Sequence, residues 1–186
     1  MVPALMYALV MAAGLGIDAP ARAADAAPSP AARCEALAGG LRLAARLQPV
    51  VADMCRRAPT FRRPVVRLAA QPGLVVTVEP AVFAISSRAL AMTDITRVNG
   101  EVRTAYVRVP AGHDLLLVEL LGHEFEHILE QLDGVELSTW VGRSGVYRVG
   151  DPRSGPVETE RARQVGRLVA GEFAAATAEI TALKVR

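Results

Sequence analysis

The segment His123-Glu124-Phe125-Glu126-His127 contains the residues of this sequence best suited to chemistry, because two imidazoles stand four residues apart with a carboxylate directly after the first. On a helix this spacing places both rings on one face, one turn apart, where they can bind one zinc ion while Glu124 reaches a water molecule on the metal. The chain has three histidines in all, so this segment holds most of them. His123 and His127 are therefore predicted metal ligands, and Glu124 is the predicted general base.

This segment lies in an apolar stretch that we expect to form a helix over residues 115–132. Asp114 suits a position just before the helix, and Asp133-Gly134 suits its end. Projected at about 100° per residue, the apolar side chains form a broad arc, and three acidic side chains form a solvent-facing stripe: Glu119, Glu126 and Glu130. The two histidines and Glu124 lie at the edge of the arc, where burial without partners would cost several kcal/mol. A bound metal ion would satisfy all three.

A catalytic zinc site needs a third protein ligand. His113 is a poor candidate, because ten residues of helix would place it about 15 Å from His123. A last helix, expected over residues 156–183, offers Glu158 and Glu160. Helical projection places Glu158 on the inward apolar face and Glu160 among arginines on the outer face, so Glu158 is the predicted ligand. The alternative role for Glu158 is to stabilise the helix dipole from the first turn.

The surrounding sequence predicts a hairpin and several short elements. Asn99-Gly100 favours a tight turn between strands over 94–98 and 101–109, because both residues tolerate positive φ. Three prolines interrupt the segment between residues 59 and 72. Further elements are expected as two short helices within 31–57, a strand over 74–78 and a short strand over 146–149.

The length of 186 residues with 52% hydrophobic residues favours one domain. An uncharged apolar run over residues 4–17, followed by Pro20 and Ala21-Arg22-Ala23, is typical of an export signal. We therefore expect a signal peptide over residues 1–23, a tether over 24–30 and a single domain over 31–186. This predicts an exported protein, periplasmic or secreted, without stable membrane association after cleavage.

Cys34 and Cys55 are the only cysteines, and an even count in an oxidising compartment favours a disulfide between them. The alternative is two separate buried thiols. The formal net charge of +2 does not indicate a nucleic-acid-binding protein. A local group of arginines between residues 56 and 67 is expected to be a solvated face.

His123-Glu124-x-x-His127 with a downstream glutamate resembles the gluzincin branch of zinc metallopeptidases. The run from Glu158 to Ala162 is similar to the glutamate-bearing helix of small exported bacterial zincins, but lacks the Glu-x-Glu-Ala-Asp pattern of one such group. The resemblance alone therefore leaves both Glu158 and Glu160 open as the ligand. It implies an α+β, minimal zincin-like fold, in which a small antiparallel sheet with a hairpin packs on the active-site helix and a C-terminal helix.

The resemblance also implies a function: hydrolysis of peptide bonds in a peptide or protein substrate, with Glu124 as base and Zn²⁺ held by His123, His127 and Glu158. Tyr147 or Tyr106 is a candidate donor to the oxyanion, although either could be a packing residue. Residues 106–109 are expected to lie along the cleft and to present backbone groups to an extended substrate.

Two other hypotheses remain open at this point. The chain could be an exported zincin-like domain that binds a metal or a partner without catalysis, or the motif could be coincidental in a helical core.

Overall fold

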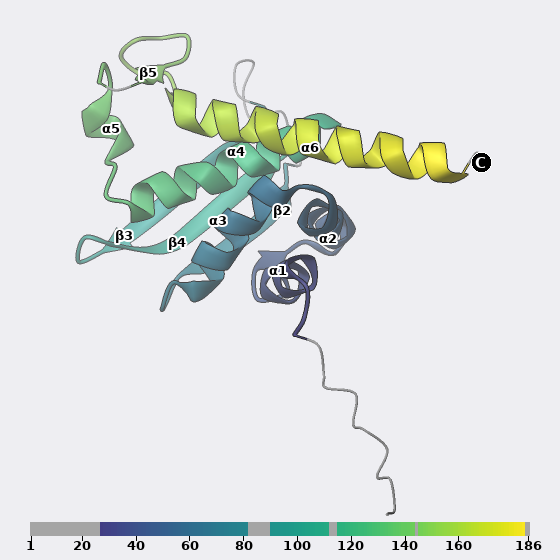
Figure 1. The fold of residues 1–186 in the computed structure, drawn as a ribbon. Helices are drawn as coiled ribbons and strands as arrows, with labels where there is room; N and C mark the ends of the chain where they lie inside the picture. The colour runs from purple at the N-terminus through teal and green to yellow at the C-terminus, as the bar shows by residue number, and fades with distance from the viewer. Residues whose placement is uncertain (1–26, 82–89, 112–114, 144, 185–186) are drawn as a thin grey trace, which may run out of the picture.

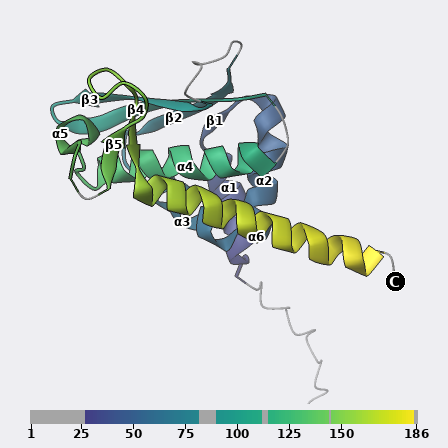
Figure 2. The same ribbon diagram turned by 90° about the horizontal axis from the view of Figure 1, so that it is seen from above.

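The computed structural model describes residues 27–81, 90–111, 115–143 and 145–184. The predicted signal peptide, His113 and Asp114 lie outside these residues. The described chain has a mixed α+β fold, with its helices on one face of a four-stranded sheet and a two-stranded sheet near one end (Figures 1 and 2). Within the described ranges, no helix is both long and apolar enough to cross a membrane.

The elements follow one another along the chain with helices at both ends and most strands between them. The helical elements are α1 (Pro30–Ala38), the 3₁₀ turn η1 (Ala45–Leu47), α2 (Gln48–Arg57), α3 (Pro59–Ala70), α4 (Leu115–Leu132), α5 (Leu137–Trp140) and α6 (Glu160–Lys184). The strands are β1 (Arg42–Leu43), β2 (Val75–Pro80), β3 (Met92–Val98), β4 (Glu101–Val109), β5 (Val146–Arg148) and β6 (Val157–Thr159).

The N-terminal helices include the two short helices predicted within residues 31–57. The first, α1, begins at Pro30, inside the expected tether, and Ser29 caps it by accepting a hydrogen bond from the backbone N–H of Ala32 at 3.1 Å. The predicted disulfide between Cys34 and Cys55 is present and joins α1 to α2. Closing this loop restricts the unfolded chain and stabilises the fold by about 3 kcal/mol.

Helix α3 occupies the segment that the prolines were expected to interrupt. Pro59 is at its first position, where a missing N–H costs nothing, while Pro64 lies inside the helix. Phe61, Val65 and Leu68 are buried on one face of α3. The free energy gained by burying these side chains outweighs the loss of the one backbone hydrogen bond that Pro64 cannot donate. The positions of the prolines alone do not indicate this gain.

The larger sheet has the strand order β1-β2-β4-β3. Strands β3 and β4 form the predicted hairpin, with φ of 51° at Asn99 and 82° at Gly100. The prediction of an antiparallel sheet is wrong beyond this hairpin, because β1, β2 and β4 are parallel. After β2 the chain reaches the far edge of the sheet, and the hairpin then returns β4 beside β2 in the same direction. Strand β3 is therefore an edge strand and β4 an interior one.

Helix α4 matches the predicted range and lies between two layers. It packs against the sheet and α3, where the rings of Phe61 and Phe125 are 5.4 Å apart, while α6 crosses it on the side away from the sheet (Figure 2). The predicted solvent stripe is wrong at Glu126 and Glu130, whose exposed fractions are 1% and 3%. Projecting α4 alone could not show that α6 and α3 cover its second face.

Helices α6 and α4 approach closely at Gly166, where an added Cβ would lie 2.8 Å from the carbonyl oxygen of Glu119 and 3.1 Å from Cβ of His123. We expect Gly166→Ala to lower the free energy of unfolding by about 1–3 kcal/mol, because the clash outweighs the better helix propensity of alanine. The matched control is Gly171→Ala on the same helix, where a Cβ meets no atom within 4 Å and should stabilise by up to about 1 kcal/mol. Urea unfolding measures both, and a Gly166→Ala protein at least as stable as wild type would contradict this packing.

Candidate metal centre

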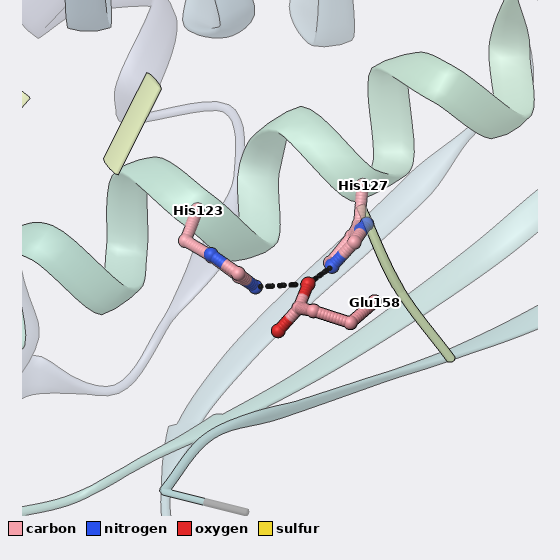
Figure 3. Close-up of side chains that lie close together, drawn as sticks. All are labelled: His123, His127 and Glu158. Atoms are coloured by element: carbon pink, nitrogen blue, oxygen red, sulfur yellow. Dashed lines mark hydrogen bonds and ion pairs between the residues drawn. The ribbon is translucent and has the colours of Figure 1, made fainter. Parts of the chain in front are cut away.

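Three side chains that are separated in the sequence converge at the end of the α4–α6 layer. His123 and His127 extend from α4, and Glu158 extends from β6 toward both rings (Figure 3). The Oε1 atom of Glu158 lies 3.1 Å from Nε2 of His123 and 2.9 Å from Nε2 of His127. One potential ligand atom from each residue lies within 4.8 Å of the other two. The predicted triad is therefore brought together.

The spacing of these atoms suits a small divalent cation. Zinc bonds of about 2.0–2.1 Å in tetrahedral geometry separate neighbouring ligand atoms by about 3.3 Å. The two measured separations from Glu158 are close to that value, and the imidazole rings are 4.7 Å apart with an interplanar angle of 85°. Small side-chain adjustments would open the position between the three atoms to an ion.

Glu158 reaches the site from a strand and not from the predicted helix. Val157–Thr159 pairs with Val146–Arg148, and α6 begins only at Glu160. The hydroxyl of Thr159 accepts a hydrogen bond from the backbone N–H of Ala162 at 3.0 Å, which caps the start of α6. The predicted ligand is the same, but the helical face used to choose it is not the reason for its position.

Glu124 lies beside the triad in a buried position, with 4% of its surface exposed. Thr93 on β3 donates a hydrogen bond from Oγ1 to Oε2 of Glu124 at 2.5 Å. Burial has the largest influence on this carboxyl and raises its pKa above the usual value, while His127, Thr93 and His123 act in the opposite direction. A carboxyl with a raised pKa is suited to accepting and returning a proton near neutral pH.

Glu130 fixes the orientation of His127. Its Oε2 lies 2.9 Å from Nδ1 of His127, and Thr159 donates to its Oε1 at 2.8 Å. Because an ionised carboxylate only accepts hydrogen bonds, Nδ1 of His127 carries the proton and Nε2 faces the site. A carboxylate behind a ligating histidine is a common arrangement that sets the tautomer and strengthens the ligand.

The carboxylates around His127 favour a positive charge on its ring. Burial is the largest influence and opposes that charge, but the hydrogen bonds to Glu130 and Glu158 and the charge of Glu124 outweigh it, and raise the pKa of His127 to about 10. For Glu158, burial acts to raise the pKa, but hydrogen bonds from both histidines lower it to about 2. In the metal-free protein, the proton on Nε2 of His127 therefore lies between this ring and Glu158, where a metal cation would bind.

This electrostatic arrangement predicts how the stability of the metal-free protein depends on pH. The folded pKa of His127 is raised from 6.5 to about 10, so its contribution is complete below about pH 6.5 and is lost as the pH rises toward 10. The free energy of unfolding in EDTA should fall across this window, with a slope of at most about 1.4 kcal/mol per pH unit. Urea unfolding at several pH values measures the slope, and His127→Asn should flatten it. An equally steep slope in that variant would contradict the prediction.

A cavity of about 540 Å³ opens beside the triad. His123, Glu124, His127 and Glu158 all contribute to its wall, so the candidate ligands and the candidate base face the same space. Most of the remaining wall is apolar and comes from β3, α4 and the segments around β5 and β6. Such a space can hold part of a ligand while excluding bulk water.

The other predicted site residues, Tyr147, Tyr106 and Glu160, do not line the cavity. Tyr147 pairs with Glu158 across β5 and β6, but its hydroxyl accepts a hydrogen bond from Arg163 at 2.9 Å and it does not line the cavity. Tyr106 donates to Glu79. Glu160 is solvent-exposed and bonded to Arg167, as its predicted outward position requires.

The expectation that residues 106–109 present backbone groups to a substrate is wrong. Strand β4 is interior, and its backbone is paired with β2 on one side and β3 on the other. Strand β3 lies along the cavity instead, and β4 is its one strand partner among the described residues.

Three residues of the site were not predicted: Thr93, Glu130 and Thr159. The spacing of Glu130 three residues after His127 places the two on one side of the helix, which is a usable signal for a supporting carboxylate. The contacts of Thr93 and Thr159 depend on how strands β3 and β6 pack on α4, and no spacing in the sequence indicates them.

Comparisons with known proteins do not assign this chain to a family. No family model matches it, and neither the curated proteins nor the solved structures contain a match. The geometry of the site is therefore the basis for the function proposed below.

Proposed function

We propose that this protein is an exported zinc-dependent metallopeptidase. The observation that carries the proposal is the convergence of His123, His127 and Glu158 beside Glu124 on the wall of one cavity. Two nitrogen ligands and one carboxylate, with a fourth position open to a cavity, form a ligand set typical of catalytic zinc. The disulfide between Cys34 and Cys55 supports an oxidising compartment and hence export.

Zinc held by His123, His127 and Glu158 would supply a water molecule of lowered pKa and would polarise the substrate carbonyl. Glu124 takes the proton from the attacking water and gives it to the leaving amine. Thr93 holds Oε2 of Glu124, which leaves Oε1 as the oxygen without a hydrogen-bond donor among the described residues. Glu130 holds the ring of His127 so that its Nε2 atom faces Glu158, where a bound ion would lie. The apolar wall of the cavity excludes competing water.

The supporting carboxylate gives a prediction for metal affinity. Glu130→Gln keeps the shape of the side chain but removes the charge that favours a cation at His127, so the zinc affinity should fall about 10- to 100-fold. Competition with a fluorescent chelator measures this change. Glu136→Gln, an exposed position beyond the end of α4, is the matched control and should leave the affinity unchanged. Equal affinity in Glu130→Gln and wild type would contradict the role of Glu130.

The whole proposal is tested by elemental analysis of the purified protein together with hydrolysis of a peptide library. One zinc per chain with EDTA-sensitive cleavage is the expected result. Stoichiometric zinc without cleavage of any peptide would favour the metal-binding domain without catalysis. Protein that takes up no zinc and gains no thermal stability from it would remove the metal centre altogether.

A further inference from the structure

Arg97 is a cationic side chain on the wall of the cavity beside the metal centre. It lies on β3 in the same alternating row as Thr93 and Ile95, which also line the cavity. The pairing of β3 with β4 shifts register between Thr96 and Arg97, as a β-bulge does. The same strand that holds Glu124 through Thr93 therefore carries a guanidinium farther along the cavity.

Among the residues that the structure describes, the charge of Arg97 has no acidic partner. Its Nη1 donates to the carbonyl oxygen of Gly100 at 2.9 Å, and its Nη2 donates to the carbonyl oxygen and to Oε1 of Gln131 at 2.9 and 2.6 Å. All three acceptors are neutral, and no ion pair involves Arg97 among the described residues. These bonds hold the side chain in place and leave Nε–H and one Nη1–H for a ligand.

The other charged groups of the cavity do not offset Arg97 once a metal is bound. The carboxylates of Glu124 and Glu158 balance the two charges of a zinc ion, and the histidines are neutral as ligands. The wall of the same cavity also includes apolar side chains such as Ile95 and Leu137. A fixed guanidinium beside apolar surface binds a carboxylate more strongly than one surrounded by water.

The position of Arg97 gives the distance at which such a carboxylate would lie. Gln131, which holds Arg97, is six residues beyond the midpoint of His123 and His127, or about 9 Å along the helix axis. An extended peptide rises about 3.3 Å per residue. We propose, on the basis of the proposed peptidase function, that Arg97 selects peptides with a carboxylate about three residues from the scissile bond.

The test measures kcat/KM for quenched fluorescent peptides in which one position at a time is Glu or Gln. Wild type should prefer Glu about 10- to 100-fold at one position about three residues from the cleaved bond, because a hydrogen-bonded charge pair contributes that much. Arg97→Gln should abolish the preference. Arg103→Gln is the matched control: it removes the same charge from the same sheet at a residue that is paired with Glu101 and does not line the cavity, and it should keep the preference.

The carboxylate could come from an acidic side chain or from the end of the peptide chain. Peptides that end three residues after the cleaved bond, with either a free or an amidated C-terminus, distinguish these two possibilities. A preference for the free acid that Arg97→Gln removes would identify a chain terminus, and a preference for internal Glu would identify a side chain. Equal rates for all these peptides in wild type would overturn the proposal while leaving the peptidase function intact.

A binding measurement keeps the inference separate from catalysis. Zinc-loaded Glu124→Gln protein is titrated with labelled Glu and Gln peptides, and anisotropy gives their Kd values. Tighter binding of the Glu peptide that is lost in the Glu124→Gln, Arg97→Gln double variant supports the role of Arg97 even if no peptide is cleaved. Equal Kd values for the two peptides would overturn it.

Discussion

Glu124→Gln is expected to lower kcat for peptide hydrolysis by about 10²- to 10⁴-fold, with zinc retained at one ion per chain. The amide cannot accept the proton of the attacking water, and general-base catalysis is worth about that factor. The variant should fold normally, because burial disfavours the charge of Glu124 and the amide has the same shape. Initial rates with a quenched peptide and elemental analysis of the same sample measure both quantities.

The control for this experiment is Glu119→Gln, which makes the same change five residues earlier on α4, outside the cavity wall. It should retain both zinc and activity. A Glu124→Gln protein that hydrolyses peptides at the wild-type rate would refute the assignment of Glu124 as the base. Loss of zinc in Glu124→Gln would show instead that Glu124 contributes to metal binding.

The second large effect is expected for Glu158→Ala compared with Glu160→Ala. Removing Glu158 takes away one of three protein ligands, so zinc affinity should fall by more than the roughly 10- to 100-fold typical of a supporting residue. Removing Glu160 should leave affinity unchanged, because its carboxylate is solvent-exposed and bonded to Arg167. Chelator competition gives both affinities from proteins that differ by two positions in the chain.

The comparison of these two glutamates also tests the fold at the start of α6. If Glu160→Ala lost zinc and Glu158→Ala kept it, Glu160 would have to occupy the position beside the two histidines. That would require a shift of two residues in the register of β6, and the pairing of β5 with β6 would then be wrong. Circular dichroism and urea unfolding of both variants exclude a general loss of structure as the cause.

The local patterns in the sequence predicted the parts of the site that lie on one element. The spacing of His123, Glu124 and His127 depends only on helical geometry, and α4 has the predicted bounds. The hairpin at Asn99-Gly100 likewise depends on two backbone conformations that few residues adopt. The disulfide between Cys34 and Cys55 was predicted from the even number of cysteines and the expected oxidising compartment.

Predictions of solvent exposure from the pattern of a single helix were wrong where a second element covers that helix. The projection of α4 assigned Glu126 and Glu130 to solvent, yet α6 brings Arg161 to within 2.6 Å of Glu126, and Arg63 of α3 lies 2.9 Å from the same carboxylate. These contacts turn a predicted surface stripe into a buried set of charges. The strand direction in the larger sheet was missed for a similar reason, since it depends on the path between β2 and β3.

The sequence by itself determined that two imidazoles and a carboxylate share one side of a helix, because that result requires only a fixed rotation per residue. Tertiary structure alone decided that Glu158 arrives from β6, that Thr93 and Glu130 hold the base and the ligand, and that Arg97 lies in the same cavity. These contacts join residues up to 35 positions apart in the sequence. Their distances depend on packing between elements, which no local periodicity encodes.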